Sequence, residues 1–397
     1  MPAAPLRALR LFRLLSRAAY GRAAVLLVVA LLCSCSTSLR LARTPGATPS
    51  PRGTSKSSPS ATPRPATLPL DLALGQLFAA SFGGPSITPG LRHLILDEKV
   101  GAVLLFKGNF GNSAGLSRLV AQLRELGHEA GLPKPLLVTL DEEGGGASQV
   151  TDVANPAAAR TLGTEGPNAV RNAYATLARA LRALGVDVDL APVADVRVNS
   201  ADDVIRDRAF GSDPGTVAPL VAAAVAGLHD GALGATLKHF PGLGAAAGDP
   251  HRALPTDPVS EDEWRARSAP PFRAGIAAGA DAVMTTAVSV PGLDPSATPA
   301  MFSPAVVTGL LREQLGFHGV IITDSLSLGG ITARYPLPAA ALGALQAGND
   351  LLLLSNADTA YEARAIDAVR QAVQSGALPV ERIEMSASRI LALPRSP

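Results

Sequence analysis

Residues 234–255 read GATLKHFPGLGAAAGDPHRALP, an apolar segment that runs into a loop carrying polar side chains. The segment begins as a predicted buried strand, and Lys238 and His239 stand where this strand should end. The run of Gly, Ala and Pro that follows cannot form a regular helix. Near the far end of the run, Asp249 and His251 are separated by one proline. A histidine beside a carboxylate suits proton transfer. The alternative is a surface loop whose polar residues only face water.

Short apolar segments of this kind recur through the chain and alternate with amphipathic stretches. The predicted strands are Leu77–Phe82, Ala102–Phe106, Leu136–Leu140, Val186–Leu190, Ala235–Lys238, Asp281–Met284, Val320–Thr323 and Asp350–Leu354. The predicted helices are Ser113–Ala130, Gly166–Leu184, Thr216–Leu228, Glu261–Ala278, Pro304–Leu315, Leu337–Ala347, Thr359–Ser375 and Pro379–Leu393. Continuous apolar strands that alternate with helices indicate a parallel sheet covered by helices. We therefore predict an α/β fold, a single-domain (β/α)8 TIM barrel over residues 69–397. An open doubly wound sheet is the alternative.

In such a barrel the active site lies at the carboxyl ends of the strands. Asp141 follows the third predicted strand, Lys238 and His239 follow the fifth, and Asp324 follows the seventh. Arg208 lies in the extended loop after the fourth strand. The sequence thus predicts that these five side chains gather on one face of the barrel.

The N-terminal region has the features of an export signal followed by a tether. A basic segment precedes the apolar run Ala23–Leu32, which as a helix would rise only about 15 Å and is too short to span a bilayer. We interpret residues 1–34 as a lipoprotein signal peptide, because Ser34 precedes Cys35 as a small residue precedes a lipidated cysteine. An ordinary secretory signal is the alternative. Residues 35–68, rich in Ser, Thr and Pro, are predicted to be a disordered tether. The expected location is extracytoplasmic, lipid-anchored to a bacterial cell membrane.

Charge and cysteine content narrow the possible partners. The chain has 397 residues and a formal net charge of +2, but residues 1–64 carry ten Lys or Arg and no Asp or Glu. Residues 65–397 therefore contain 25 basic and 33 acidic side chains. A mildly acidic domain gives no indication of nucleic-acid binding. The two cysteines both precede the predicted domain, which excludes a disulfide or a thiolate metal site within it.

Several motifs together carry a family resemblance. The sequence KHFPG at 238–242, followed by DPH at 249–251, resembles the signature of glycoside hydrolase family 3, in particular its single-domain β-N-acetylglucosaminidases. Five further segments agree in order and spacing: GAVLLFKGN at 101–109, TLDEEGG at 139–145, APVAD at 191–195, RAFGSDP at 208–214 and LREQLGFHGVIITDSL at 311–326. The resemblance extends over roughly residues 70–395 and supports the barrel prediction.

The resemblance implies a retaining hydrolase that removes terminal β-N-acetylhexosamine from peptidoglycan fragments or related glycans. Asp324 matches the nucleophile, which forms a glycosyl-enzyme intermediate. His251 matches the proton donor, and Asp249 is its partner. We expect that no metal or organic cofactor is needed, because two side chains supply the nucleophile and the proton relay, and we expect a monomer. For Asp324, the alternative is a structural role as a helix N-cap.

The same resemblance places four residues against the sugar hydroxyls. Asp141, Arg208, Lys238 and His239 match sugar-binding positions of the family. Charged donors and acceptors around a polyol are what a sugar pocket requires. A structural ion pair between Asp141 and Arg208 is the alternative.

The chain also departs from the family pattern. Gly146 and Gln149 stand where the family usually has arginines, whereas Leu243 and Ala287 replace two histidines. Ser325 stands where a second Asp often follows the nucleophile. Losing such partners can cost orders of magnitude in rate. Two alternatives therefore stay open: a degenerate envelope lipoprotein that binds glycan without hydrolysis, and a glycosidase of other specificity, such as a β-glucosidase.

Overall fold

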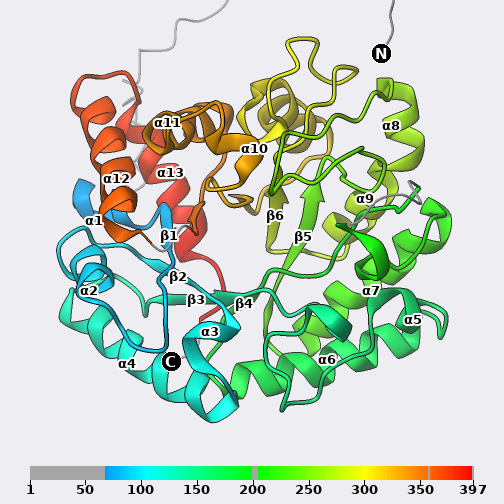
Figure 1. Ribbon diagram of the computed structural model, residues 1–397, viewed down its shortest axis with the longest axis horizontal. Coiled ribbons are helices and arrows are strands. Elements are labelled where there is room, and N and C mark those ends of the chain that lie inside the picture. Colours follow the sequence, from blue (N-terminus) through cyan, green and yellow to red (C-terminus); the bar gives the residue numbers. More distant parts are fainter. Residues whose placement is uncertain (1–67, 199–203, 356–357, 396–397) are drawn as a thin grey trace, which may run out of the picture. The chain divides into compact units, whose positions relative to one another are not determined.

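The computed structural model describes residues 68–198, 204–355 and 358–395 (Figure 1). Within these residues, eight parallel strands form one sheet in the order β7-β6-β5-β4-β3-β2-β1-β8. The strands are β1 Phe78–Ala80, β2 Ala102–Leu105, β3 Leu137–Leu140, β4 Val188–Asp189, β5 Gly234–Phe240, β6 Ala282–Thr285, β7 Val320–Thr323 and β8 Leu352–Leu354. All their residues are buried, as expected for strands covered on both faces.

The sheet closes on itself. The last strand β8 pairs in parallel with β1. On its other side, Ile322 of β7 forms a parallel bridge to Leu351, and the Thr323 amide donates to the Leu351 carbonyl at 2.9 Å. The predicted (β/α)8 barrel is thereby confirmed, and the open doubly wound sheet is excluded, since such a sheet has two free edges.

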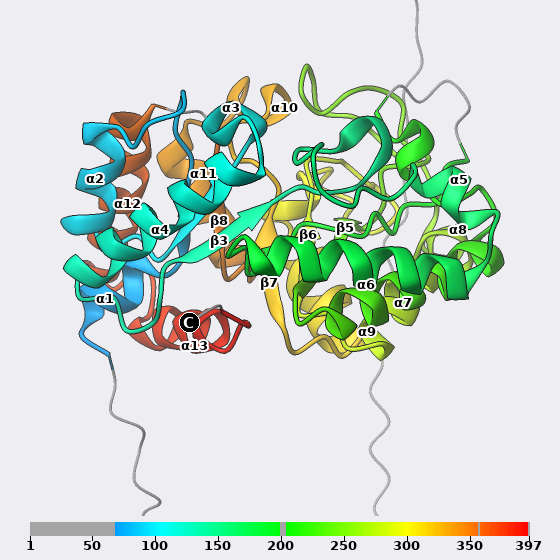
Figure 2. The same cartoon turned by 90° about the horizontal axis from the view of Figure 1, so that it is seen from below.

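Helices surround the strands. The longer ones are α2 Pro89–Leu96, α4 Ser113–Glu129, α6 Pro167–Ala183, α7 Pro214–Asp230, α8 Glu261–Arg267, α9 Ala269–Ala277, α11 Leu337–Ala347, α12 Thr359–Gln374, α13 Val380–Leu391 and the wider π-type helix η4 Ala305–Gln314. The shorter ones are α1 Leu70–Gly75, α3 Lys107–Phe110, α5 Ala159–Gly163 and α10 Gly329–Thr332. Figure 2 shows α3 and α10, which follow strands β2 and β7, at the opposite end of the barrel from α13.

Two sequence predictions need correction. The predicted helix 261–278 is two helices, α8 and α9, with Ser268 between them. The second helix begins with Ala269 and two prolines, which lack the amide hydrogen that a continuous helix would need. The fifth strand is also longer than the predicted Ala235–Lys238: it runs from Gly234 to Phe240, because Phe240 still pairs with Thr285 of β6.

The predicted signal peptide (1–34) with Cys35, and the tether (35–68) apart from its last residue, lie outside the described residues. Among the residues that are described, no helix is both long and apolar enough to cross a membrane.

Candidate active site

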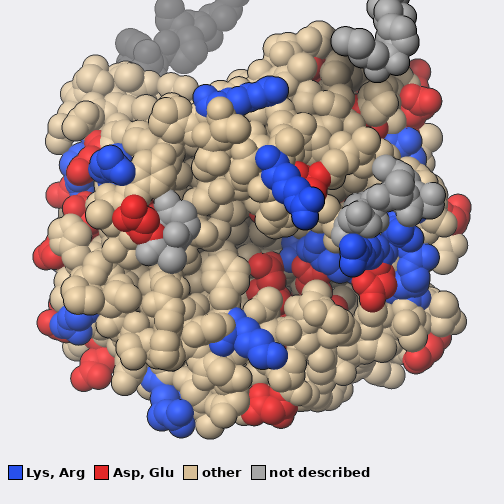
Figure 3. All heavy atoms as spheres, viewed as in Figure 1, with Lys and Arg blue, Asp and Glu red and all other residues tan. Residues whose placement is uncertain are grey.

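A cavity of about 380 Å³ lies at the carboxyl ends of the strands. Its lining includes six of the seven residues predicted for catalysis or sugar binding: Asp141, Arg208, Lys238, His239, His251 and Asp324. The rest of the wall is largely apolar and includes Leu104, Phe106, Val204, Leu243, Pro250, Met284, Leu328 and Leu353. Figure 3 shows a hollow near the middle of the face, with acidic and basic side chains at its margin. The barrel therefore gathers the predicted residues in one place.

Lys238 is almost fully buried and lies between two carboxylates. Its Nζ atom is 2.6 Å from Asp141 Oδ1 and 2.6 Å from Glu143 Oε1. Burial by itself would lower the pKa of Lys238, but the negative charges of Asp141 and Glu143 outweigh burial and raise the pKa. Lys238 is thus held as a cation at the floor of the cavity, where its position is fixed from two sides.

Glu143 also forms a bidentate salt bridge with Arg208. The Arg208 Nε and Nη2 atoms donate to the two Glu143 carboxylate oxygens at 2.6 and 2.7 Å. Burial would raise the pKa of Glu143, but the charges of Lys238 and Arg208 together lower it far below its usual range. The predicted alternative, an ion pair between Asp141 and Arg208, is wrong, because Arg208 pairs with Glu143 and Asp141 pairs with Lys238.

His239 is oriented by a buried carboxylate. Its Nδ1 atom lies 2.7 Å from Asp195 Oδ2, and the same oxygen accepts the His239 backbone amide at 3.1 Å. The other Asp195 oxygen accepts the Leu243 amide at 2.5 Å. The His239 Nε2 atom is 3.4 Å from Arg208 Nη2. Asp195 therefore fixes the imidazole so that Nε2 lies on the cavity side of the ring.

The Asp324 carboxylate is held by two donors. The Thr286 hydroxyl donates to Oδ2 at 2.7 Å, and the Ser325 amide donates to Oδ1 at 2.7 Å. Asp324 is not a helix N-cap, because the following helix α10 begins at Gly329 and Leu328 occupies the capping position. The alternative structural role is therefore wrong. The two hydrogen bonds fix the orientation of this carboxylate at the cavity wall.

Asp249 and His251 form a hydrogen-bonded pair at the rim. The His251 Nδ1 atom lies 2.7 Å from Asp249 Oδ1, which also accepts the His251 amide at 2.9 Å. Desolvation works against ionisation of Asp249, but the hydrogen bonds from His251 outweigh it and lower the pKa of Asp249. The His251 side chain is 67% exposed and lines the cavity, so its remaining nitrogen, Nε2, is accessible to a bound molecule.

Sequence reasoning assigned no role in the site to Glu143, Asp195 or Thr286. Glu143 and Asp195 belong to segments that follow strands, and carboxylates at that position were a usable signal. Thr286 follows β6 and carries no charge, so nothing in its residue type marks it as the partner of Asp324. Its contact joins residues 38 positions apart in the sequence.

The positions that depart from the family pattern have ordinary surroundings. The Gln149 side chain accepts the Lys107 amide at 3.0 Å and is not part of the cavity wall. Leu243 is an apolar part of that wall. Ala287 is fully buried. None of these three supplies a charged group to the cavity.

A buried acid lies beneath the site. The Asp189 side chain on β4 is inaccessible to solvent; one oxygen accepts the Glu142 amide at 2.8 Å, and the other has no hydrogen-bond partner. Burial raises the pKa of Asp189 well above its ordinary value, and the nearby Glu142 adds to this effect. The charged form of Asp189 is therefore disfavoured in the folded protein relative to the unfolded chain.

Replacing Asp189 with Asn should stabilise the protein increasingly as the pH rises. Below a pH of about 3.8, the unfolded and folded chains both bind the proton, so the pH has no effect through this group. Between this pH and the raised pKa of the folded protein, the unfolded chain releases the proton and the folded chain keeps it, so wild-type stability falls by up to about 1.4 kcal/mol per pH unit. The Asn side chain does not titrate in this range, so the variant lacks this pH dependence of its stability. Urea unfolding of both proteins from pH 4 to 7 measures the difference.

Asp187→Asn is the matched control. The Asp187 carboxylate is also buried, but it lies 2.8 Å from Arg124 Nη2. Removing its charge should destabilise the protein at neutral pH, because Arg124 loses its partner. A constant difference between wild type and Asp189→Asn across the pH range would show that Asp189 is ionised in the folded protein.

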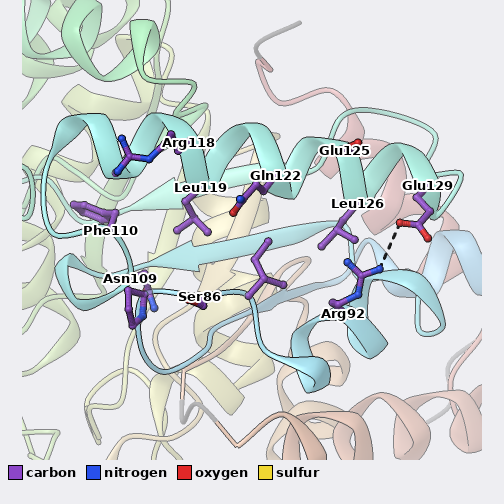
Figure 4. A pocket seen from close by; sticks show the side chains of 13 residues that line it. Ser86, Arg92, Asn109, Phe110, Arg118, Leu119, Gln122, Glu125, Leu126 and Glu129 are labelled. Carbon is purple, nitrogen blue, oxygen red and sulfur yellow. Dashed lines mark ion pairs between the residues drawn. The ribbon is translucent and has the colours of Figure 1, made fainter.

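A second hollow, of about 730 Å³, lies away from these residues between α2 and α4. Figure 4 shows its side chains, which include Arg118, Gln122 and Glu125 along α4 and an ion pair between Arg92 and Glu129 at 3.6 Å. It contains none of the predicted site residues. Throughout the described part of the chain, no group of three or more His, Cys, Asp or Glu side chains is placed to hold a metal ion.

Comparison with known proteins agrees with this geometry. Residues 69–393 match the family described as Glycosyl hydrolase family 3 N terminal domain. The chain is similar to a beta-hexosaminidase of Stenotrophomonas maltophilia (37% identity, 70% of this chain and 83% of the relative) and to one of Idiomarina loihiensis (32% identity, 77% and 92%).

Solved structures agree as well. A family 3 beta-N-acetylglucosaminidase from Paenibacillus superposes with a TM-score of 0.79 at 37% identity, over 82% of this chain and 62% of the other. A beta-N-acetylhexosaminidase from Beutenbergia cavernae gives a TM-score of 0.77 at 32% identity, over 82% of this chain and 98% of the other. The family match and the two curated relatives together establish that the chain belongs to glycosyl hydrolase family 3, and that the protein is a glycoside hydrolase.

Proposed function

We propose that the protein is a retaining β-N-acetylhexosaminidase that removes terminal N-acetylglucosamine from peptidoglycan fragments or related glycans. The observation that carries the proposal is that Asp324 and His251 line one cavity, each oriented by its own hydrogen-bond partner. The names of the similar proteins support the sugar specificity. Peptidoglycan as the source of the sugar is consistent with the predicted export of the chain.

The mechanism uses two displacements at the anomeric carbon. Asp324 attacks this carbon and forms a glycosyl ester, while His251 donates a proton to the departing oxygen. His251 then accepts a proton from water, which hydrolyses the ester and restores Asp324. Asp249 acts as a positioning residue, because it holds the His251 Nδ1 atom and stabilises the imidazolium.

The charged floor of the cavity binds the sugar. Lys238 and Arg208 present hydrogen-bond donors, whereas Asp141 presents an acceptor for a hydroxyl. The Nε2 atom of His239 provides a further hydrogen-bonding group for the sugar. Because Glu143 neutralises part of the positive charge, the floor suits a neutral polyol better than an anion.

The decisive experiment is hydrolysis of aryl glycosides by the purified protein. We expect turnover of an aryl β-N-acetylglucosaminide, much slower turnover of the matching β-glucoside, and a product released first as the β-anomer, which NMR detects. Preference for the glucoside would identify a β-glucosidase, and a first-formed α-anomer would exclude the double displacement.

A second candidate is a protein that binds glycan without hydrolysing it. It is favoured by one observation: Leu243 places an apolar side chain in the cavity where the family usually has a histidine. Sugar binding by calorimetry with no measurable turnover would support this candidate. Leu243→His combined with Gln149→Arg should then restore hydrolysis if these losses inactivated the protein.

We also propose that the mature protein is a monomer anchored to the outer side of a bacterial membrane through a lipid on Cys35. The sequence before Cys35 and the small residue Ser34 support this proposal. When expressed in a bacterium, the wild-type protein should partition into the detergent phase on Triton X-114 extraction. Cys35→Ser should move to the aqueous phase, whereas Cys33→Ser, the matched control, should not. Detergent partitioning of Cys35→Ser would exclude the anchor.

A further inference from the structure

The loop that carries His251 contacts the segment that follows Asp324. The Gly330 amide, at the start of α10, donates to the Pro250 carbonyl at 2.9 Å. Gly329 lies against the His251 carbonyl, and Gly330 lies against the backbone of Ala253 and Leu254. The loops that carry the two proposed catalytic residues therefore meet backbone to backbone.

This contact requires the absence of side chains at both glycines. A Cβ atom at Gly329 would lie 2.3 Å from the His251 carbonyl oxygen, and one at Gly330 would lie 2.8 Å from the Leu254 nitrogen. Both distances are too short for a non-bonded contact between a Cβ atom and backbone atoms, so one of the two segments would have to move. Neither glycine has a positive φ, so an alanine could adopt the local backbone. The glycines are therefore needed for close approach and not for conformation.

The loop is fastened independently at its two ends. At its start, the Trp264 indole nitrogen donates to the Pro241 carbonyl at 2.8 Å. At its end, the Asp257 amide donates to the Ser289 carbonyl at 2.9 Å. Between these points, His251 lies on a turn in which the Asp249 carbonyl accepts the amides of the third and fourth residues that follow it, at 2.9 and 3.0 Å. The glycine contact is thus made at the tip of an anchored loop.

We propose that Gly329 and Gly330 act as a latch that holds the His251 turn over the cavity at the position needed for proton donation. The inference rests on the proposed hydrolase function. The pair are positioning residues, since they act through His251. The two glycines also couple the position of the proton donor to the position of the nucleophile. They contact the His251 turn, and Gly329 follows Asp324 by only five residues.

The test compares Gly329→Ala with wild type on two aryl β-N-acetylglucosaminides. Methoxyphenol is a poor leaving group that needs a proton, whereas dinitrophenol leaves readily as an anion. With the turn displaced, kcat/KM should fall by about 10- to 100-fold on the methoxyphenyl substrate. The factor lost on the dinitrophenyl substrate should be smaller by about tenfold or more. In a His251→Ala background, Gly329→Ala should cause no further loss, because the latch acts only through His251.

Gly343→Ala is the matched control. This glycine lies in the neighbouring helix α11, and a Cβ there would be 3.8 Å from the nearest side-chain atom, so neither substrate should be affected. If Gly329→Ala does not fold, Gly330→Ala repeats the test through its contact with Leu254. Equal losses on both substrates, unchanged rates, or an added loss in the His251→Ala background would overturn the latch. A wild-type protein inactive on both substrates would instead refute the proposed function.

Discussion

Replacing Asp324 with Ala should reduce turnover of every glycoside substrate by at least about 10⁴-fold, the scale on which enzymes lose activity with their nucleophile. No covalent intermediate can form without the carboxylate. Thr286 and Ser325 would keep their positions but have no carboxylate to orient. Initial rates on the dinitrophenyl substrate measure the loss most sensitively, because that substrate needs no proton from the protein.

Azide provides the control for this variant. A small anion can enter the space left by the Asp324 side chain and attack the same face of the anomeric carbon. Azide should therefore restore part of the turnover and produce the α-glycosyl azide, which wild type does not form. Turnover of Asp324→Ala near the wild-type rate would show that another group is the nucleophile. A β-azide would place the attacking group on the other face of the sugar.

Replacing His251 with Ala should have an effect that depends strongly on the leaving group. The methoxyphenyl substrate should lose about 10²- to 10⁴-fold in kcat/KM, the range that a general acid contributes. The dinitrophenyl substrate should lose far less in the glycosylation step, because its anion is stable without a proton. A plot of log kcat/KM against the pKa of the leaving phenol should therefore become steeper in the variant than in wild type.

Asp249→Ala should show a milder form of the same pattern. Asp249 does not line the cavity, and its contribution passes through the His251 Nδ1 atom. Asp249→Asn keeps an acceptor for that nitrogen but removes the charge, so it should lie between Asp249→Ala and wild type. His251→Ala with equal losses on good and poor leaving groups would exclude its role as the proton donor.

Hydrophobic pattern alone predicted most of the barrel. The strand at Val320–Thr323 and the helix Leu337–Ala347 have the predicted bounds, because each is an apolar or amphipathic stretch bordered by Gly or Pro. The break at Ser268 and the extension of β5 were not predicted. Pro270 and Pro271 were a usable signal for the break, because neither can donate the amide hydrogen that a continuous helix needs. The β5 extension depends on neighbours distant in sequence.

Sequence also placed the candidate site residues on one face, since the carboxyl ends of parallel strands meet at one end of a barrel. It could not determine which charges pair. Asp141, Glu143, Arg208 and Lys238 are consistent with several pairings, and the choice depends on side-chain distances between β5, the loop after β3 and the loop after β4. Only the tertiary structure assigned Arg208 to Glu143 and Lys238 to both Asp141 and Glu143.

By itself, then, the sequence determined the barrel, the side of the barrel that carries the cavity, and the family to which the chain is similar, because strand pattern and motif order are local properties. The tertiary structure decided the contacts that join distant segments: Thr286 with Asp324, and the paired glycines with the His251 turn. These contacts depend on the distance between loops that leave different strands. No local pattern of residues encodes that distance, because the packing of the whole barrel sets it.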